Sequence, residues 1–428
     1  MKKLFTLTLL GALAYIAPMT AKSQEANVDS LAIKVEQLNK QVSSFATELK
    51  SRVKVTGYIQ AQWQLAEEDG ALTSFNGGAF PTDENNRFAV RRGRFKFNYD
   101  YEGVTGIIQV DVTEKGISLK DAYLGYTLKS KVFGVTAGVF KRPFGYEVTN
   151  SSSKRETPER SRLYQNLFPG SRDVGAKITL QGKEGSFLNA FTFNGGLFNG
   201  NGINSETNNA KDFIGRLAFN KKTDPVEIGL GTSVYAGQVR NDVASSYTFN
   251  DDTKSYTENT NAEGLYSKRF YWGVDAQFTI NTEAGRTNLR GDYILGQQPG
   301  TYSSSMSPTG AIASSVYNRK FAGYAIYLVQ GIKQSPFSVA ARYDFYDPNR
   351  QISASEIGAG SGTGYSDVAF KTLSSSFIWD ISKTFRVMAN YEVVWNEKCA
   401  NLTNAANGYN YSKDLRDNIF TLRLQARF

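Results

Sequence analysis

Residues 87–112 read RFAVRRGRFKFNYDYEGVTGIIQVDV, and apolar and polar side chains alternate along most of this stretch. Alternation with period two is typical of a β-strand with one apolar face and one polar face. Arg92, Arg94 and Lys96 share the polar face of one strand, and an ordinary two-sided core does not accept such a row of charges. These strands suit a wall that has lipid on one side and water on the other.

Similar runs recur to the end of the chain, and they predict sixteen strands. We expect them at 52–65, 88–99, 104–112, 119–128, 131–140, 172–181, 187–198, 212–220, 226–239, 268–280, 286–297, 318–331, 336–346, 367–379, 384–396 and 416–428. Sixteen strands that close into a barrel leave an aqueous lumen, whereas eight are filled by side chains. The predicted fold class is therefore an all-β, sixteen-stranded antiparallel transmembrane β-barrel.

The connections between the predicted strands divide into two kinds. Those after the even-numbered strands are short, such as DYEG and LKSK, and those after the odd-numbered strands are mostly long and polar. Short turns at one end and long loops at the other are typical of outer-membrane barrels. With an even number of strands, the first strand begins and the last strand ends on the short-turn side, which is the periplasmic side.

The N-terminus has the pattern of a secretory signal. Lys2 and Lys3 precede the apolar run LFTLTLLGALAYIA, and Ala21-Lys22-Ser23 supplies a small-x-small cleavage site. A membrane-spanning anchor is the alternative, but the run is short and polar sequence follows it. We expect residues 1–23 to be a signal peptide.

Residues 24–50 have a different period. Val28, Leu31, Val35, Leu38, Val42, Phe45 and Leu49 are spaced three and four residues apart in alternation, which is a heptad pattern. The pattern favours a short periplasmic coiled coil over a single amphipathic helix lying on the barrel or membrane. The expected organisation is a signal peptide at 1–23, a coiled-coil segment at 24–50 and a transmembrane β-barrel at 51–428.

Composition narrows the function. The chain has no histidine, which argues against a histidine-based catalytic triad, a histidine general base and a histidine-rich metal site. Its sole cysteine, Cys399, cannot form an internal disulfide. We therefore expect no catalytic residues, no metal site and no cofactor. The formal net charge is +9, and we expect small anions rather than nucleic acid as partners.

The polar faces of the predicted strands carry charges of both signs, which fits either a generic wet interior or an anion-selective pore. The cluster of Arg91, Arg92, Arg94 and Lys96 favours anions, because rings of Arg or Lys select them. Strict alternation points Arg91 outward. A bulge near Gly93, where the pattern slips, would turn Arg91 towards the lumen.

The longest connection, 141–171, is rich in charge and serine and also carries aromatic residues that favour burial. The common outcome for such a loop is a solvated surface position. Its aromatic residues instead suggest that it folds into the barrel and narrows it.

Several motifs occur in a fixed order, namely RRGRF, SLKDAYLGY, GVFKRPFG, PERSRL, GSRDVGAKI and the terminal LRLQARF. As an ordered set this resembles the porin O/P family of phosphate- and polyphosphate-selective outer-membrane porins. The resemblance covers roughly 51–428 and is densest between 87 and 180. It implies a homotrimer of sixteen-stranded barrels in outer-membrane lipid, each barrel with its own channel narrowed by an inward-folded third loop.

The resemblance also implies an anion site. The paired arginines Arg91 and Arg92 would help to bind the anion, Lys141 would join them, and Asp121 would limit how tightly the anion is held. The residue-level pattern adds Arg94, and the hydroxyls of Ser151, Ser152 and Ser153 follow the KRPF motif. The predicted third strand, VTGIIQVDV, carries no lysine where phosphate-selective members have one, so the resemblance implies anion preference more firmly than strict phosphate specificity.

Three functions remain open from the sequence. The first is an outer-membrane diffusion porin for phosphate and similar small anions. The second is a pore for another polar solute, such as a short sugar or peptide. The third is a mainly structural barrel that connects the outer membrane to the cell wall through its coiled coil. We favour the first because of the basic cluster.

Overall fold

The computed structural model describes residues 24–72, 79–359 and 362–428 and divides into two units, Met1–Val53 and Lys54–Phe428. The predicted signal peptide, 1–23, lies outside the described residues. Helix α2 (Gln24–Arg52) occupies the first unit, and its large apolar side chains are exposed, from 49% at Val35 to 65% at Phe45. The helix agrees with the heptad spacing, and its pairing into a coiled coil stays a prediction. No helix in the described part of the chain is long and apolar enough to cross a membrane.

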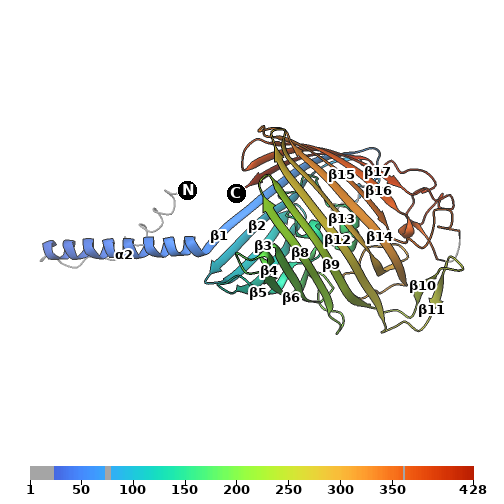
Figure 1. Cartoon of the computed structure of the whole chain (residues 1–428), viewed down its shortest axis with the longest axis horizontal. Coiled ribbons are helices and arrows are strands. Elements are labelled where there is room, and N and C mark those ends of the chain that lie inside the picture. The colour runs from blue at the N-terminus through green and yellow to red at the C-terminus, as the bar shows by residue number, and fades with distance from the viewer. Residues whose placement is uncertain (1–23, 73–78, 360–361) are drawn as a thin grey trace. The chain divides into compact units, whose positions relative to one another are not determined.

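The second unit is a barrel of antiparallel strands (Figure 1). The described residues form eighteen strands, of which β10 (Ser246–Asn250) and β11 (Ser255–Asn259) form a hairpin within one long loop, so that 18 − 2 = 16 strands build the wall. The wall strands are β1 (Val53–Ala66), β2 (Asn86–Tyr101), β3 (Val104–Thr113), β4 (Gly116–Thr127), β5 (Phe133–Lys141), β6 (Arg172–Gln181), β7 (Phe191–Phe198), β8 (Asp212–Thr223), β9 (Val226–Arg240), β12 (Tyr266–Thr282), β13 (Gly285–Thr301), β14 (Val316–Gly331), β15 (Phe337–Asp347), β16 (Phe370–Asp380), β17 (Phe385–Asn396) and β18 (Ile419–Arg427).

The first and last strands close the barrel. β1 pairs with β18 in an antiparallel register that runs from Tyr58 opposite Arg427 to Ala66 opposite Ile419. Beyond this ladder, Gly57 and Phe428 exchange two backbone hydrogen bonds of 2.9 and 3.0 Å. Closure pairs the edge strands, which would otherwise expose unpaired backbone groups to lipid. The predicted sixteen-stranded antiparallel barrel is confirmed.

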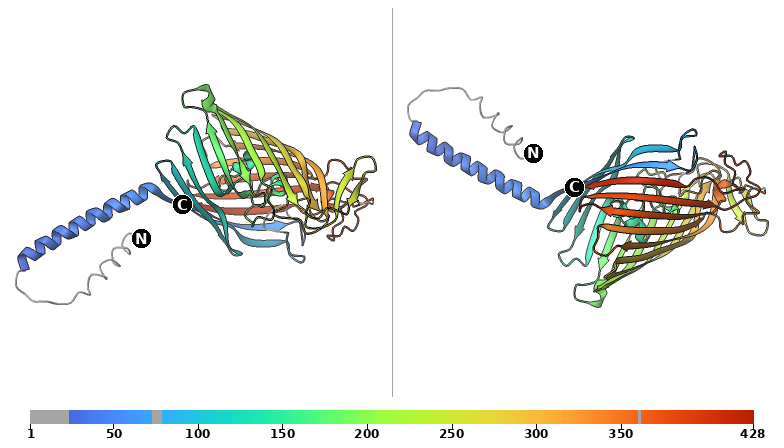
Figure 2. Two further views of the ribbon diagram at one scale, coloured as in Figure 1. Left: turned by 90° about the horizontal axis from the view of Figure 1, so that it is seen from below. Right: turned by 90° about the horizontal axis from the view of Figure 1, so that it is seen from above.

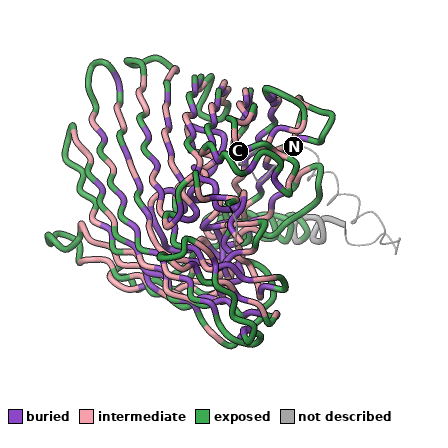
Figure 3. The backbone as a smooth tube through the Cα atoms, turned by 90° about the vertical axis from the view of Figure 1, so that its right-hand side faces the viewer, coloured by how far each residue is buried: buried purple, intermediate pink, exposed green. Residues whose placement is uncertain are grey.

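Period-two patterning decides which side chains face inward. In β1, Gln60, Gln62 and Gln64 are buried inside the barrel, whereas Ile59 and Leu65 on the other face are exposed. Figure 3 shows the same alternation of buried and exposed residues along neighbouring strands. The apolar face is thus the lipid-facing surface, and the polar side chains hydrogen-bond to one another and to inserted chain inside.

The two ends of the barrel differ in loop length, and the long loops lie together at one end (Figure 2). The β2–β3 connection is a tight hairpin in which Glu102 and Gly103 have positive φ values of 50° and 84°, as a type I′ turn requires. Several boundaries differ from expectation by a few residues. β7, for example, starts at Phe191, because the preceding Phe187–Ala190 forms the 3₁₀ helix η1. The β10–β11 hairpin was not predicted, since its two strands lie in a polar loop without a lipid-facing pattern.

Candidate functional site

The connection between β5 and β6, residues 142–171, folds into the barrel and is called the inserted loop below. It contains the short helices α3 (Gly145–Thr149) and α4 (Arg162–Leu167). Its aromatic and aliphatic side chains pack against the inner wall in one buried cluster. The cluster consists of Phe140, Phe144, Val148, Leu163, Tyr164, Leu167, Phe168, Phe198, Ile214, Tyr235, Tyr271, Ile294, Phe321 and Tyr346. The loop therefore fills the side of the lumen that faces β7 to β15, as its aromatic content predicts.

Polar contacts fix the inserted loop to the same wall. The Tyr164 hydroxyl donates to Asp292 Oδ1 at 2.6 Å, and the Tyr327 hydroxyl donates to Glu147 Oε1 at 2.5 Å. The Arg162 backbone N–H donates to Asp344 Oδ1 at 3.1 Å. Two wall carboxylates, Asp292 and Asp344, thus hold the loop and line neither of the cavities described below.

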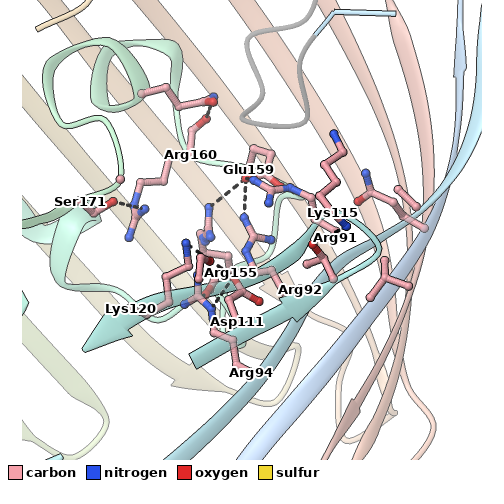
Figure 4. Close-up of a pocket in the computed structure, with 18 of the residues that line it drawn as sticks. Arg91, Arg92, Arg94, Asp111, Lys115, Lys120, Arg155, Glu159, Arg160 and Ser171 are labelled. Atoms are coloured by element: carbon pink, nitrogen blue, oxygen red, sulfur yellow. Dashed lines mark hydrogen bonds and ion pairs between the residues drawn. The ribbon is translucent and has the colours of Figure 1, made fainter. Parts of the chain in front are cut away.

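The open part lies between the inserted loop and β2 to β4. It is a cavity of about 350 Å³, called the vestibule below, and its lining includes side chains from the long-loop ends of these strands (Figure 4). Ten arginine and lysine side chains line the vestibule against three carboxylates, so its field is strongly positive. The basic lining residues are Arg87, Arg91, Arg92, Arg94, Lys115, Lys120, Lys141, Arg155, Arg160 and Arg172, and the acidic ones are Asp111, Glu114 and Glu159.

Arg91 and Arg92 both reach the Glu159 carboxylate of the inserted loop. Arg91 Nε and Nη2 lie 2.8 and 3.0 Å from its two oxygens, and Arg92 Nη2 lies 2.6 Å from Oε2. Neighbouring residues of a regular strand cannot point the same way. Here the Gly93 N–H donates to the Asp111 side chain at 3.0 Å, and the ladder to β3 begins only at Arg94. Arg91 therefore faces the lumen, and the bulge expected near Gly93 stays a prediction, because the ladder from Arg94 onward has no register shift.

Two further arginines complete the surroundings of Glu159. Arg423 Nη2 on β18 lies 3.1 Å from Oε1, and Arg155 Nη1 of the inserted loop lies 3.8 Å from Oε2. Burial alone would raise the pKa of the Glu159 carboxyl, but the charges of Arg91, Arg92, Arg423 and Arg155 outweigh burial and hold this pKa well below its usual range.

Arg94 follows Arg92 by two residues on the same face of β2 and is also buried. Its Nε lies 3.3 Å from Asp111 Oδ2, and its Nη1 donates to the Ser152 hydroxyl at 3.0 Å. Of the three predicted serines, Ser152 therefore joins the arginines directly. Ser151 and Ser153 hydrogen-bond to each other through their hydroxyls at 3.1 Å.

Asp121 and Lys141 each have hydrogen-bond partners within the protein. Asp121 accepts from Arg172 Nε at 3.2 Å and from Arg172 Nη2 at 3.1 Å. Lys141 Nζ donates to the backbone carbonyls of Thr149 at 2.8 Å and Asn150 at 3.1 Å. Within the described part of the chain, no carboxylate lies within ion-pair distance of Lys141.

Arg160 approaches the same carbonyl as Lys141. Arg160 Nη2 lies 3.5 Å from the Asn150 oxygen and 3.1 Å from the Val148 carbonyl oxygen. Its Nε donates to the Glu147 carbonyl at 3.0 Å, and its Nη1 donates to the Ser171 hydroxyl at 2.7 Å. All these partners are uncharged. Burial lowers the pKa of the Arg160 guanidinium to about 10, the Glu147 charge opposes this, and nearby arginines add to it. Two cations therefore meet here without a carboxylate counter-charge among the described residues.

A second cavity of about 390 Å³, called the exit cavity below, adjoins the vestibule on the short-turn side. It is lined by five basic side chains, Arg94, Lys96, Lys141, Arg172 and Lys177, and one carboxylate, Asp121. Arg94, Lys141 and Arg172 line both cavities. These three residues mark the passage from one cavity to the other, which we call the junction.

The sequence alone did not single out Glu159, Arg155, Arg160 or Arg172 as site residues. Their only signal was the density of charge in the inserted loop and in the PERSRL and GSRDVGAKI motifs. A loop has no periodicity from which facing can be inferred, so its contacts follow only from where its aromatic residues pack. Among the described residues, no group of His, Cys, Asp and Glu side chains could hold a metal ion.

Comparison with known proteins places this geometry in context. A family model described as phosphate-selective porin O and P matches residues 86–428. A search of curated proteins finds no match.

Solved structures with a similar fold include the outer membrane channel DcaP of Acinetobacter baumannii, at 14% identity, 88% coverage of this chain, 97% of that chain and a TM-score of 0.52. An anion-selective porin from Comamonas acidovorans matches at 12% identity, 88% and 99% coverage and a TM-score of 0.52. OmpF of Salmonella typhi matches at 13% identity, 88% and 97% coverage and a TM-score of 0.52. At these identities the likeness concerns the fold.

The family model covers most of the chain, the closed sixteen-stranded wall is that of a porin, and the open part of the lumen is lined by an excess of positive charge. The chain belongs to the phosphate-selective porin O and P family and is an anion-selective channel of the outer membrane.

Proposed function

We propose that phosphate and similar small anions pass through the vestibule and bind where it meets the junction, with Lys141 of the junction and Arg160 of the vestibule as the principal contacts. The observation that carries this proposal is the approach of both cations to the Asn150 carbonyl without a carboxylate partner in the described residues. An anion in transit would supply the counter-charge. Arg94 and Arg172 border the same passage and would add further contacts.

The arrangement suits transport better than storage. The guanidinium groups of Arg160, Arg94 and Arg172 offer planar pairs of N–H donors that match phosphate oxygens. Each of them is already partly used by a protein partner, so each contact with the anion is moderate. A conducting site must also release what it binds, and several moderate contacts allow this.

Arg91 and Arg92 take a different part in this proposal from the one that the sequence predicts. Their guanidinium groups are held by Glu159, so they contribute to the positive field of the vestibule more than to direct binding. Such a field raises the local concentration of anions at the entrance, and this effect weakens as salt screens it.

Conductance in planar bilayers tests the proposal. With a KCl gradient, the reversal potential of the purified channel should indicate preference for chloride, and added phosphate should block the chloride current. Arg160→Ala removes one charge-assisted contact, worth about 1.5–3 kcal/mol, so the phosphate concentration for half-block should rise by about tenfold to a hundredfold. Lys141→Ala should act in the same direction.

The matched control is Arg216→Ala, because Arg216 is a lumen arginine that pairs with Asp275 at 2.6 Å on β12 and lines neither cavity. It should leave phosphate block close to wild type. Equal effects of Arg160→Ala and Arg216→Ala would mean that phosphate block depends on the overall positive charge of the lumen and not on a specific site. Weak ion selectivity would favour a pore for an uncharged solute, and absence of an open channel would favour a structural barrel.

We also propose that α2 assembles with the α2 helices of other copies to support a homotrimer. The support is the heptad spacing together with the exposure of Leu31, Leu38 and Phe45, which are 64%, 58% and 65% exposed. Replacing all three by Asp should weaken the oligomer in sedimentation while the barrel keeps its heat-modifiable mobility, since charged d positions disrupt a coiled-coil seam. Loss of the folded barrel in this variant would contradict the division into two units.

A further inference from the structure

The Glu159 carboxylate is surrounded by arginine side chains at the wall of the vestibule. Arg91 binds both of its oxygens, as one guanidinium binds two oxygens of a phosphate. Arg92 and Arg423 bind from β2 and β18 at 2.6 and 3.1 Å, and Arg155 lies at 3.8 Å. Four cations thus surround one carboxylate at the wall of the vestibule, and all five side chains are largely buried.

The backbone of the inserted loop holds this carboxylate in place independently of the β2 arginines. The Glu159 carbonyl accepts from Arg342 Nη1 at 2.9 Å and from the Thr157 hydroxyl at 2.8 Å. The neighbouring Pro158 carbonyl accepts from Arg423 Nη1 at 2.6 Å. Contacts from β15 and β18 therefore fix the chain on both sides of the carboxylate, and Glu159 acts as a stationary charge.

The charge of the arginine cluster depends on whether Glu159 is ionised, and this affects how the cluster can bind a moving anion. With Glu159 ionised, the cluster of four arginines carries a surplus of three positive charges, and the two β2 arginines are occupied. Without it, four buried guanidinium groups would face one another unpaired, which is unfavourable unless another anion enters. The cluster would then be a second and tighter anion site beside the passage.

We propose that Glu159 is a specificity-determining residue that acts as a built-in anion. It fills the arginine cluster of Arg91, Arg92, Arg155 and Arg423, and so leaves the junction as the place where the moving anion binds and limits how long the vestibule retains it. The inference rests on the proposed function, since it concerns the same passage. Asp121 weakens binding at the junction itself through Arg172, whereas Glu159 acts at a separate cluster.

Phosphate block of chloride current, measured on single channels, tests this role. Glu159→Gln keeps the shape of the side chain and removes its charge, so phosphate should block at a concentration at least about tenfold lower than in wild type, with longer blocked intervals. Glu159→Asp keeps the charge and should stay near wild type. Glu114→Gln removes a carboxylate from the same vestibule outside the arginine cluster and should change the half-blocking concentration by less than about twofold.

Chemical rescue separates an occupied anion site from a structural support. In Glu159→Ala, acetate should enter the vacated cluster, bind its arginines and shift phosphate block back towards wild type, whereas acetate should have little effect on wild type. Unchanged or weaker phosphate block in Glu159→Gln, or absence of acetate rescue in Glu159→Ala, would overturn the inference. If wild type itself shows no phosphate block, the proposed function fails. If wild type is blocked and Glu159→Gln behaves as wild type, only the role of Glu159 fails.

Discussion

Phe168→Ala should release the inserted loop from the barrel wall without unfolding the barrel. The Phe168 ring is 1% exposed and has four aromatic neighbours, with centroid distances of 4.9 Å to Phe144, 5.6 Å to Tyr164, 5.8 Å to Tyr271 and 6.3 Å to Tyr235. Two of these partners belong to the loop and two to the wall. The ring therefore lies at the contact between the loop and the strands that hold it.

The magnitude follows from burial and ring contacts. Truncating a fully buried Phe to Ala costs about 3–5 kcal/mol, and each lost aromatic pair is worth about 0.5–1.5 kcal/mol beyond burial. A loss of about 3 kcal/mol from loop docking shifts the ratio of docked to released loop by more than a hundredfold. The barrel ladders do not involve this side chain, so their stability should change little.

Single-channel recording measures the result. A released loop leaves a wider lumen, so Phe168→Ala should show larger and noisier conductance steps. Phosphate block should be weaker, because Arg160 leaves the vestibule together with the loop. Phe97→Ala is the matched control, since Phe97 lies on β2 and is 49% exposed on its outer face. Wild-type conductance and block from a folded Phe168→Ala barrel would refute the assignment of this cluster as the anchor of the loop.

Two further substitutions test other parts of the structure. Asp121→Asn removes the charged partner of Arg172, whose Nη2 lies 3.1 Å from the carboxylate. This change should lower the half-blocking phosphate concentration by about threefold to tenfold. An unchanged concentration would show that Asp121 does not limit how tightly the anion is held. Gly57→Ala should reduce the yield of heat-modifiable barrel, because a Cβ there would lie 2.3 Å from the Arg94 carbonyl and 2.4 Å from the Phe428 ring at the closing seam. Gly106→Ala is its control, since the nearest atoms would lie 3.6 Å away, and equal yields from both variants would contradict this reading of the seam.

Much of the architecture could be predicted from the sequence because it depends on local patterning. The alternation in β1 separates Gln60, Gln62 and Gln64 from Ile59 and Leu65 without reference to any other strand. The hairpin at Glu102 and Gly103 is likewise encoded in two residues. Strand number, the inward face of regular strands such as β1 and the segregation of loop lengths all follow from such signals, and the structure confirms them.

The candidate site depended on contacts between distant parts of the chain. Arg91 and Arg92 were predicted as anion contacts, yet the structure joins them to Glu159, which lies 68 and 67 residues further along the chain. Arg423 reaches the same carboxylate across 264 residues. Period-two patterning could place Arg92 in the lumen, but it carries no information about which loop carboxylate arrives there.

The sequence by itself therefore determined the barrel, its polar interior and the excess of positive charge between 87 and 177. Only the tertiary structure decided which of those charges are neutralised and which stay available, namely Arg91 and Arg92 held by Glu159, and Lys141 and Arg160 held only by uncharged groups. The physical reason is that strand facing is set by neighbours in the chain. Ion pairing is set by the position of the inserted loop in the lumen. Its aromatic residues determine that position by packing against strands β7 to β15.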